Sequence, residues 1–264
     1  VSRHCAMTVF QNEDDQSYFL EYGLLRGAPQ CLVRGSGVDV EELRVALDDR
    51  ERVLATRREL APDGAPIVLM VARLVPMKGV REFMQAARNL RSRRRAHFVL
   101  VGPVDETERS SQQLLEEVRA CKEVTYLGKR DDVPQLLATA SVFVLPTYYR
   151  EGLPRVLLEA AALDVPLIST PVPGCRDVVH HETTGLVVQP RDPEGIARAV
   201  QRILDAVRPE PGERVLQIGC GSGYYTALLA ELVGPSGHVL ALDIVPELAQ
   251  RAKANLADRA NVEV

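Results

Sequence analysis

The feature that most constrains this chain is a regular alternation of short apolar runs and amphipathic stretches that starts at Pro66. The apolar runs are expected strands, at 67–71, 97–101, 124–127, 142–145, 167–170 and 186–188. The expected helices are one that ends at about Leu90, then 110–121, 133–138, 154–163, a short one at 175–179, and 193–205. Strands that are apolar throughout are typical of a parallel sheet covered by helices on both faces. The sequence therefore predicts an α/β fold with a doubly wound parallel sheet.

The residues before Pro66 are less regular. Residues 4–12 are expected to form a strand that runs into a polar turn, and Asn12 to cap a helix over Glu13–Tyr22, whose acidic first turn suits the helix dipole. Residues 30–39 are expected to form a second short strand, interrupted by two glycines. Residues 40–65 are charged and lack a clean period, so we expect a connector there.

Composition excludes several classes of protein. The chain has 264 residues, 46% of them hydrophobic, which is enough for one large or two smaller cores. Its formal net charge of -4 argues, at the level of the whole chain, against binding to nucleic acid or to an anionic membrane. The five cysteines form no C-x-x-C pair, so we expect reduced thiols and a cytoplasmic location. No apolar run approaches the ~18 residues of a membrane helix. Because Val1 is not a methionine, we expect a fragment of a longer protein.

The stretch 141–159 combines a buried strand, a polar loop and a helix that opens at Pro154. Its loop brings Glu151 and the backbone amides of Gly152 and Leu153 to the carboxyl end of a strand, where ligands bind in open α/β sheets. With Glu159 two turns into the helix, two carboxylates could bind an elongated polar ligand. The alternative is a dipole partner and a solvated charge.

A basic pair, Arg73 and Lys78, follows the first strand of the regular region. Both residues should lie at the sheet edge that receives Glu151. There an arginine and a lysine could neutralise a diphosphate. Two ordinary surface charges are the alternative interpretation.

Several motifs occur together in a recognisable order: GSGVD, VARLVPMKGVREF, FVLVGPVD, the long stretch from YLGKRDD to GCRDVV, and TGLVVQPRDPEGIARAV. Over about 9–205 this set resembles the family 4 glycosyltransferases, and more narrowly the bacterial enzymes that build surface polysaccharides. The resemblance implies the GT-B architecture of two Rossmann-like domains, of which this chain would supply the C-terminal, donor-binding one. It also implies retention of anomeric configuration and no requirement for a metal or other cofactor.

The resemblance assigns roles to the residues singled out above. It implies that Glu151 meets the transferred sugar, that Glu159 binds the ribose hydroxyls, and that Arg73 and Lys78 hold the diphosphate and stabilise its charge as it leaves. The catalytic residues implied are thus Glu151, Arg73 and Lys78. Gly152, Leu153 and Glu159 complete the implied donor site.

The chain departs from the family pattern at Asp164, where a glycine is usual, and at Asp177, where a glutamate is common. The acceptor domain with its catalytic histidine would precede Val1. None of His4, His180 and His181 is an obvious replacement for that histidine.

A second signature begins near Pro211 and covers 211–264. The expected strand 215–218 leads into Gly219, Gly221 and Gly223, then a helix, and a second strand ends at Asp243. Glycines let a backbone approach a ligand closely, and an acid at the second strand end can hold ribose hydroxyls. This stretch resembles the opening of a class I methyltransferase, most closely protein-L-isoaspartate O-methyltransferase, which implies an S-adenosyl-L-methionine site at these four residues. An ordinary βαβ turn is the alternative, and Gln217 stands where an acidic residue is common.

The sequence thus predicts three parts: 1–40, the remnant of a GT-B N-terminal domain with a linker; 41–206, a nucleotide-sugar-binding domain; and 207–264, a truncated βαβαβ Rossmann-like unit. The favoured function is transfer of a sugar from a nucleotide-sugar, UDP-linked, to a glycan or lipid-linked acceptor by an incomplete enzyme. The alternatives are a methyltransferase fragment, in which we expect no methyl transfer, and an inactive binding module or fusion product. No nucleic acid, metal or transmembrane segment is expected, and peripheral membrane association of the complete enzyme stays open.

Overall fold

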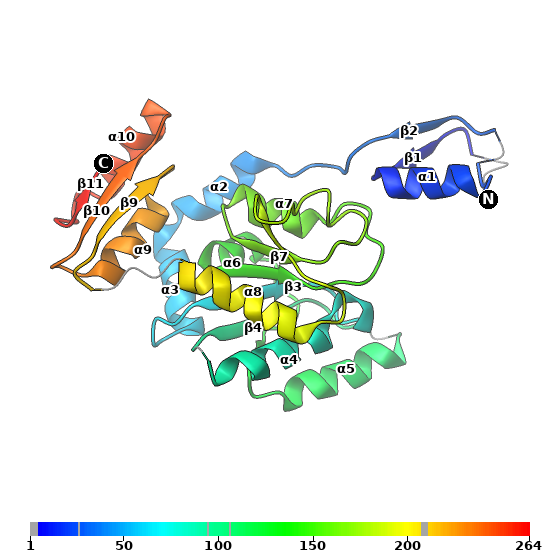
Figure 1. The fold of residues 1–264 in the computed structure, drawn as a ribbon, viewed down its shortest axis with the longest axis horizontal. Coiled ribbons are helices and arrows are strands. Elements are labelled where there is room, and N and C mark those ends of the chain that lie inside the picture. The colour runs from blue at the N-terminus through cyan, green and yellow to red at the C-terminus, as the bar shows by residue number, and fades with distance from the viewer. Residues whose placement is uncertain (1–4, 26, 94, 106, 207–210) are drawn as a thin grey trace. The chain divides into compact units, whose positions relative to one another are not determined.

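In the computed structural model, which describes residues 5–25, 27–93, 95–105, 107–206 and 211–264, the chain forms two compact units, Val1–Leu204 and Asp205–Val264. We call them unit 1 and unit 2. Figure 1 shows their elements along the chain. The part of the expected first strand at His4 lies outside the described residues.

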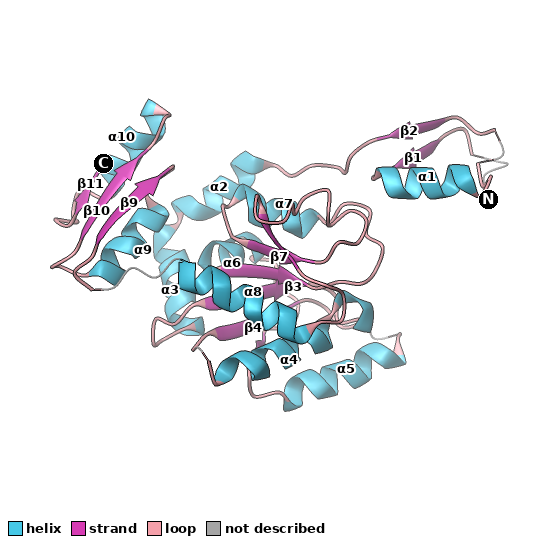
Figure 2. Ribbon diagram, in the orientation of Figure 1, coloured by secondary structure: helices cyan, strands magenta, loops and turns pink. Residues whose placement is uncertain are grey.

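Unit 1 is built around a six-stranded parallel sheet in the order β5-β4-β3-β6-β7-β8. Its strands are β3 (Ile67–Val71), β4 (His97–Val101), β5 (Val124–Tyr126), β6 (Val142–Leu145), β7 (Leu167–Ser169) and β8 (Gly185–Val187). The helices between and after these strands are, in chain order, η2 (a 3-10 turn, Pro76–Lys78), α4 (Val80–Arg91), α5 (Arg109–Ala120), α6 (Val133–Thr139), α7 (Arg155–Ala162) and α8 (Pro193–Ala206). Figure 2 shows this alternation of strand and helix.

Helices cover both faces of this sheet, which explains why its strands are apolar throughout. On β3, Val68 and Met70 belong to a core shared with α4, α5 and α8. Ile67 and Leu69, which point to the opposite face, pack with residues of α6 and α7. The doubly wound parallel α/β sheet predicted from the sequence is confirmed.

Two sequence expectations in unit 1 are wrong. The charged stretch 40–65 contains two helices, α2 (Val40–Asp48) and α3 (Arg50–Leu60), each started by an aspartate. The carboxylate of Asp39 accepts from the N–H of Glu42 at 3.0 Å, and Asp49 caps α3 in the same way. Leu43 and Val53 are buried, but so few apolar residues leave no visible period.

The short helix expected at 175–179 is instead a series of turns. The N–H of Cys175 bonds to the carbonyl of Val172, and that of Val179 to the carbonyl of Cys175. Gly174, immediately before this segment, has a φ of 80° in the left-handed region, so no helical turn extends back across it.

The N-terminal part of unit 1 is a small βαβ element. It consists of β1 (Thr8–Phe10), α1 (Glu13–Glu21) and β2 (Gln30–Leu32), with the two strands parallel. The predicted cap is confirmed, because the Oδ1 atom of Asn12 accepts from the N–H of Asp15 at 2.8 Å.

Unit 2 has a three-stranded parallel sheet in the order β11-β10-β9. Its elements are β9 (Arg214–Ile218), α9 (Tyr224–Val233), β10 (His238–Leu242), α10 (Pro246–Asn255) and β11 (Val262–Glu263). Val239 and Ala241 are fully buried under residues of the two helices. On the opposite face of the sheet, Leu216 and Ile218 are 57% and 76% exposed. The partial βαβαβ unit predicted from the sequence is therefore present, with one apolar face uncovered.

Candidate functional site

The strand order of unit 1 singles out one place on its sheet. β3 and β6 are neighbours, but the chain after β3 continues to β4 on one side, and the chain after β6 continues to β7 on the other. The chain therefore leaves the carboxyl ends of these two strands in opposite directions along the sheet. This reversal is the point at which open α/β sheets bind ligands, in the crevice outside the strand ends.

The loops that follow β3 and β6 meet at this point. Gly79 makes the approach possible, because its φ is 80° and a Cβ there would lie 2.2 Å from the carbonyl oxygen of Pro146. The N–H of Tyr148 bonds to the carbonyl of Met77 at 2.9 Å, and the Thr147 hydroxyl donates to that carbonyl at 3.1 Å. The 3-10 turn that carries Lys78 is thereby fixed against the loop that carries Glu151.

Lys78 and Glu151 form a nearly buried ion pair at the centre of the site. Their Nζ and Oε1 atoms are 2.5 Å apart, and only 16% and 10% of the two side chains are exposed. The Thr147 hydroxyl lies 3.1 Å from the same Oε1 atom, so its single hydrogen is shared between this carboxylate and the Met77 carbonyl. Among the described residues, no protein group bonds to Oε2 of Glu151. That oxygen and two of the three ammonium hydrogens are left to bind a ligand.

The other two predicted side chains lie on the same connections but have different neighbours. Arg73, just beyond β3, is exposed and forms no ion pair within the described residues; its charge helps to lower the pKa of Asp105, after the hydrogen bonds from Thr107. Glu159, on α7, accepts from the guanidinium of Arg155 at 2.9 Å and is 16% exposed. The structure thus brings Lys78 and Glu151 into contact, whereas Arg73 and Glu159 do not contact that pair directly.

The N-terminal βαβ element is hydrogen-bonded to the backbone of the loop that carries Glu151, which we call the glutamate loop. The Nδ2 atom of Asn12 donates to the carbonyl oxygens of Glu151 at 3.1 Å and Gly152 at 2.9 Å. Gly152 allows this approach, since a Cβ there would lie 2.0 Å from Oε1 of Gln11. In the described structure, the amides of Gly152 and Leu153 donate to no protein group, so both are available to an anion.

Asn12 and Thr147 are functional-site residues that sequence reasoning missed. Asn12 was expected only as a helix cap, and its second contact lies 139 positions along the chain. Thr147 could have been recognised as the hydroxyl-bearing residue two positions after β6, on the same loop as Glu151 and four positions before it.

Aromatic side chains border the pair. The ammonium of Lys78 lies 5.6 Å from the ring centroid of Tyr149, which is 46% exposed. The guanidinium of Arg191 stacks on Tyr148 at 4.5 Å. Behind Glu151, Cys175 is fully buried, and burial raises the pKa of its thiol to about 12. This cysteine is therefore a neutral, unreactive group in the core beneath the site at neutral pH.

Comparison with known proteins decides the family. A sequence profile described as "Glycosyl transferases group 1" matches residues 65–206, more than half of the chain. The chain belongs to the group 1 glycosyl transferases. A second profile, for protein-L-isoaspartate(D-aspartate) O-methyltransferase, matches residues 194–264, so this glycosyl transferase carries a methyltransferase-like segment after its family domain.

Individual relatives repeat this division. An N,N'-diacetylbacillosaminyl-diphospho-undecaprenol alpha-1,3-N-acetylgalactosaminyltransferase from Campylobacter jejuni is 30% identical over 197 residues, which are 75% of this chain and 50% of that one. A protein-L-isoaspartate O-methyltransferase from Aeropyrum pernix is 56% identical over 57 residues, 22% of each chain. The glycosyl transferase thus spans about half the length of its sugar-transferring relative.

Solved structures agree on the fold. The Anabaena protein HepE in complex with UDP and glucose has a TM-score of 0.67 at 19% identity, covering 77% of this chain and 55% of its own. A sucrose-phosphate synthase from Thermosynechococcus elongatus has a TM-score of 0.59 at 26% identity, covering 75% and 49%. These likenesses show the GT-B Rossmann-like fold expected from the sequence.

The second candidate site is the glycine loop of unit 2. Gly219, Gly221 and Gly223 all have positive φ angles, of 79°, 53° and 89°. Asp243, at the end of β10, accepts from the N–H of Gly221 at 2.8 Å and from that of Val245 at 2.9 Å. These backbone hydrogen bonds lower the pKa of Asp243 and keep its carboxylate ionised.

The geometry of this loop is compatible with the implied cofactor. A Cβ on Gly219 or Gly221 would meet no atom within 4 Å, so the backbone there has open space beside it. Gln217, which replaces the expected acid, accepts from the buried Thr226 hydroxyl at 2.7 Å and so has a structural partner of its own.

The described residues contain neither a metal-binding cluster nor a membrane-spanning helix. Within them, no cluster of three or more His, Cys, Asp or Glu side chains could hold a metal ion. No helix in that part of the chain has the length and apolarity to cross a membrane.

Proposed function

We propose that unit 1 binds the donor of a retaining glycosyl transfer, a UDP-sugar, and stabilises the departing diphosphate. The observation that carries the proposal is the Lys78–Glu151 pair at the reversal point of the sheet, with two unused backbone amides beside it. An ammonium and two amides are suited to the charge that develops on a leaving phosphate. The similarity to a UDP-bound structure supports uridine as the nucleoside.

Each side chain would contribute a defined interaction. As the bond between the anomeric carbon and the diphosphate oxygen breaks, negative charge grows on that oxygen. Lys78 and Arg73 would stabilise it, together with the amides of Gly152 and Leu153. The free Oε2 of Glu151 would accept a hydrogen bond from a hydroxyl of the transferred sugar. Glu159 would accept hydrogen bonds from the two hydroxyls of the ribose. Because these groups supply the stabilisation, the proposed reaction uses no metal.

The ion pair also explains how Lys78 is positioned. A lysine side chain has several rotatable bonds, and ordering it on binding costs roughly 2 kcal/mol of rotamer entropy. Here Glu151 already holds the ammonium in place. Part of that cost is therefore met during folding rather than on binding.

The acceptor is proposed from the relatives. The C. jejuni relative is named for a diphospho-undecaprenol substrate, and another relative is a UDP-Gal:alpha-D-GlcNAc-diphosphoundecaprenol galactosyltransferase from Escherichia coli. We propose a glycan or lipid-linked acceptor for the complete enzyme. We also propose that residues 1–40 are what this chain contains of the acceptor domain, since Asn12 already contacts the glutamate loop.

Titration with UDP tests the donor site. We expect the chain to bind UDP, and the double variant Arg73→Ala/Lys78→Ala to bind it at least roughly 30-fold more weakly, because two charge-assisted contacts are lost. Lys129→Ala, which removes an exposed cation outside the site, should bind like the unaltered chain. If UDP binding survives the double substitution, the assignment of the diphosphate site is wrong.

For unit 2 we propose binding of S-adenosyl-L-methionine without methyl transfer. When bound, the cofactor would supply an activated methyl group, and Gly219, Gly221, Gly223 and Asp243 would hold its nucleoside and its carboxyl-bearing part. The stretch that matches the A. pernix enzyme corresponds to only 22% of that enzyme's length, and we propose no methyl transfer by unit 2. A measurable methylation of isoaspartyl peptide by this chain would overturn the second half of the proposal.

A further inference from the structure

A second concave site lies in unit 1 at the amino ends of its strands. The loops that carry Lys78 and Glu151, which we call the donor loops, lie at the carboxyl ends. The second site is a cavity of about 510 Å³ at the amino ends of β4 and β5. His97 and Phe98 begin β4, and Thr125 is the second residue of β5. Because all six strands are parallel, their amino and carboxyl ends lie on opposite edges. The cavity is thus separate from the Lys78–Glu151 site.

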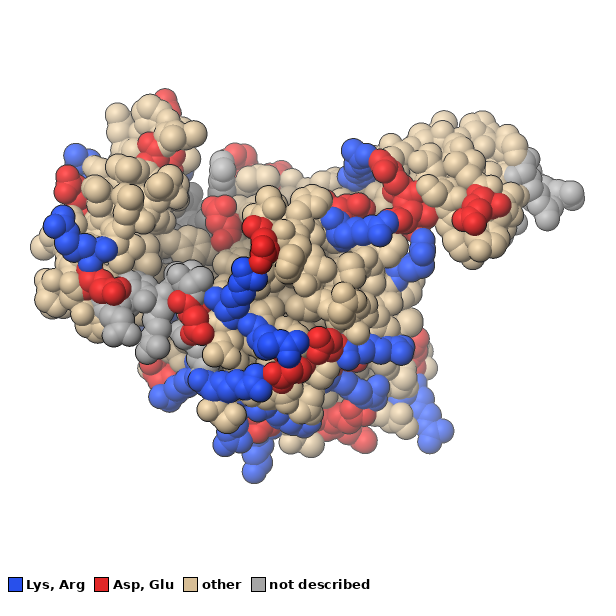
Figure 3. Space-filling model, in the orientation of Figure 1, with Lys and Arg blue, Asp and Glu red and all other residues tan. Residues whose placement is uncertain are grey.

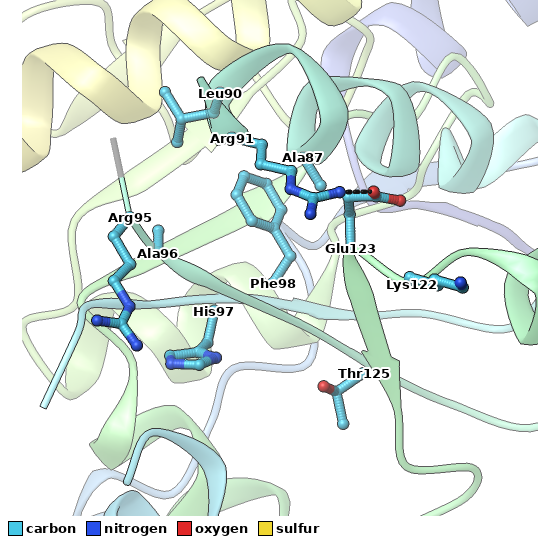
Figure 4. A pocket seen from close by; sticks show the side chains of 10 residues that line it. All are labelled: Ala87, Leu90, Arg91, Arg95, Ala96, His97, Phe98, Lys122, Glu123 and Thr125. Atoms are coloured by element: carbon cyan, nitrogen blue, oxygen red, sulfur yellow. Dashed lines mark hydrogen bonds and ion pairs between the residues drawn. The ribbon is translucent and has the colours of Figure 1, made fainter. Parts of the chain in front are cut away.

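Cationic side chains surround this cavity on several sides. Arg91 comes from the last turn of α4, Arg95 from the segment before β4, and Lys122 from the turn before β5. Figure 4 shows Arg91 above the Phe98 ring, Arg95 on the side of His97, and Lys122 on the far side of Glu123. The hydroxyl of Thr125 adds a neutral donor to the lining.

The cations outnumber the acids that they contact. Glu123 is shared between Arg91, at 2.8 Å, and Arg88, at 3.7 Å. Asp63 is likewise shared between Arg95 and His97, at 2.5 Å and 2.7 Å. Each acid therefore serves two basic groups.

Lys122 adds to this excess of positive charge. It is exposed and has no ion-pair partner within the described residues. Counting only Lys, Arg, Asp and Glu among the described residues, Arg88, Arg91, Arg95 and Lys122 stand against Glu123 and Asp63, a formal excess of two positive charges in a chain whose formal net charge is -4. Figure 3 shows many Lys and Arg side chains along the lower part of unit 1, with Asp and Glu side chains between them.

The two shared acids pair with the arginines without using all of their N–H donors. A guanidinium paired through one edge still presents further N–H donors. The volume lies within the range of small-molecule sites and exceeds that of a simple ion contact. Excess charge, ordered donors and sufficient volume are what a phosphate group requires of a binding site.

We propose that this cavity, lined by Arg91, Arg95, Lys122 and Thr125, is a second anion site that binds a phosphate group, distinct from the diphosphate site of the donor. The phosphate would be carried either by a soluble phosphate compound or by the head group of an anionic lipid. The two sources present the same chemistry to the cavity.

Titration with inorganic pyrophosphate, followed through the ¹H–¹⁵N resonances of the whole chain, tests the proposal. The His97 and Thr125 amides should shift in a saturable way at low salt. This readout separates the cavity from the donor site, where pyrophosphate would move the amides of Gly152 and Leu153. The two proposals can therefore fail independently.

Substitutions localise the effect. Lys122→Gln should weaken the binding seen at His97 and Thr125 by roughly five-fold, and Arg95→Gln/Lys122→Gln by roughly 20-fold. Lys129→Gln, an equal change of charge at another exposed position, should leave the titration unchanged. Shifts confined to the donor loops, or cavity shifts that the double variant does not weaken, would overturn the proposal.

Vesicles identify the source of the phosphate. If a lipid head group is the ligand, the chain should sediment with phosphatidylglycerol vesicles but not with phosphatidylcholine ones, and Arg95→Gln/Lys122→Gln should abolish this. If a soluble compound is the ligand, pyrophosphate binds at the cavity and vesicles do not. Vesicle binding that the double variant retains, without a pyrophosphate response at His97, contradicts the site.

Discussion

The first strand of each sheet shows how differently the two units are built. In β3, Ile67, Val68, Leu69 and Met70 are fully buried, because helices cover both faces of the six-stranded sheet. In β9, burial alternates, and Leu216 is 57% exposed. Yet both strands are followed by a loop with left-handed glycine angles, at Gly79 after β3 and at Gly219, Gly221 and Gly223 after β9. A glycine-containing loop of this kind therefore forms even on a sheet that is covered on one face only.

The acidic side chains of the two candidate sites, Glu151 and Asp243, have different hydrogen-bond partners. In unit 1, Glu151 is nearly buried and is paired with a lysine from another strand connection. In unit 2, Asp243 is bound by the backbone amides of its own βαβ unit. The first arrangement depends on a sheet with a reversal point, whereas the second requires only two neighbouring strands.

The same truncation in the two first strands should have very different effects. We expect Leu69→Ala to lower the free energy of unfolding of unit 1 by about 3 kcal/mol, because it opens a cavity in a core that cannot fully relax. Leu216→Ala should change that of unit 2 by less than about 0.5 kcal/mol, since the side chain is already in contact with solvent. Hydrogen exchange resolved by unit measures both values. Equal losses would contradict the contrast in burial.

Removing the cation of the central pair should be the next largest effect. Lys78→Met leaves Glu151 charged and nearly buried without its partner. We expect a loss of about 2 kcal/mol in unit 1, below the full value for a buried pair because both side chains keep some exposure. Lys78→Met/Glu151→Gln should recover part of the loss. Hydrogen exchange of the β6 and α7 amides measures both variants, and no recovery would indicate that the pair is not coupled.

Asp164 offers a smaller test with the opposite sign. It lies just beyond α7 with a φ of 57°, and the N–H of Val165 bonds back to the carbonyl of Ala160, as in helix ends that favour glycine. Asp164→Gly should therefore stabilise unit 1 by about 0.5–1 kcal/mol and leave unit 2 unchanged. Chemical denaturation monitored for each unit measures this. A destabilised unit 1 would show that the aspartate side chain matters more than the backbone angle.

Thiol reactivity gives the finest comparison. With a pKa of about 12, Cys175 should be about one part in a thousand thiolate at pH 9, and its alkylation should rise about tenfold per pH unit up to that value. Exposed Cys5 should react readily at pH 8, and Cys220 of unit 2 faster than Cys175. Mass spectrometry after brief iodoacetamide treatment ranks them. Fast labelling of Cys175 in the folded chain would mean that its surroundings open.

Much of this architecture could be predicted from the sequence because the relevant signals are local. Apolar strands predicted the doubly wound sheet, and positions just after the expected strands 67–71 and 142–145 placed Lys78 and Glu151 at one edge. The contact from Asn12 to the glutamate loop could not be predicted in this way, since it joins residues 139 positions apart and either partner could bond to water instead. The cavity at Arg91, Arg95 and Lys122 likewise depends on three separate segments whose meeting only the fold reveals.

Helix formation at 40–65 was missed for a related reason. The stability of α2 and α3 depends on aspartate caps and on a few contacts with the core, so the charged surface hides their period. Asp39 and Asp49 were nevertheless visible as capping residues before helix-forming stretches. Attention to capping residues in addition to apolar spacing would have found both helices.

Hydrogen exchange with and without saturating UDP tests most directly whether the reversal point of unit 1 is the nucleotide-sugar site. At a UDP concentration about 100 times the dissociation constant, bound ligand should add about 2.7 kcal/mol to the protection of the β3 and β6 amides. Unit 2 should show no change, and Arg73→Ala/Lys78→Ala should remove the gain. Protection that appears around Gly219–Gly223 instead, or that persists in the double variant, would contradict the account.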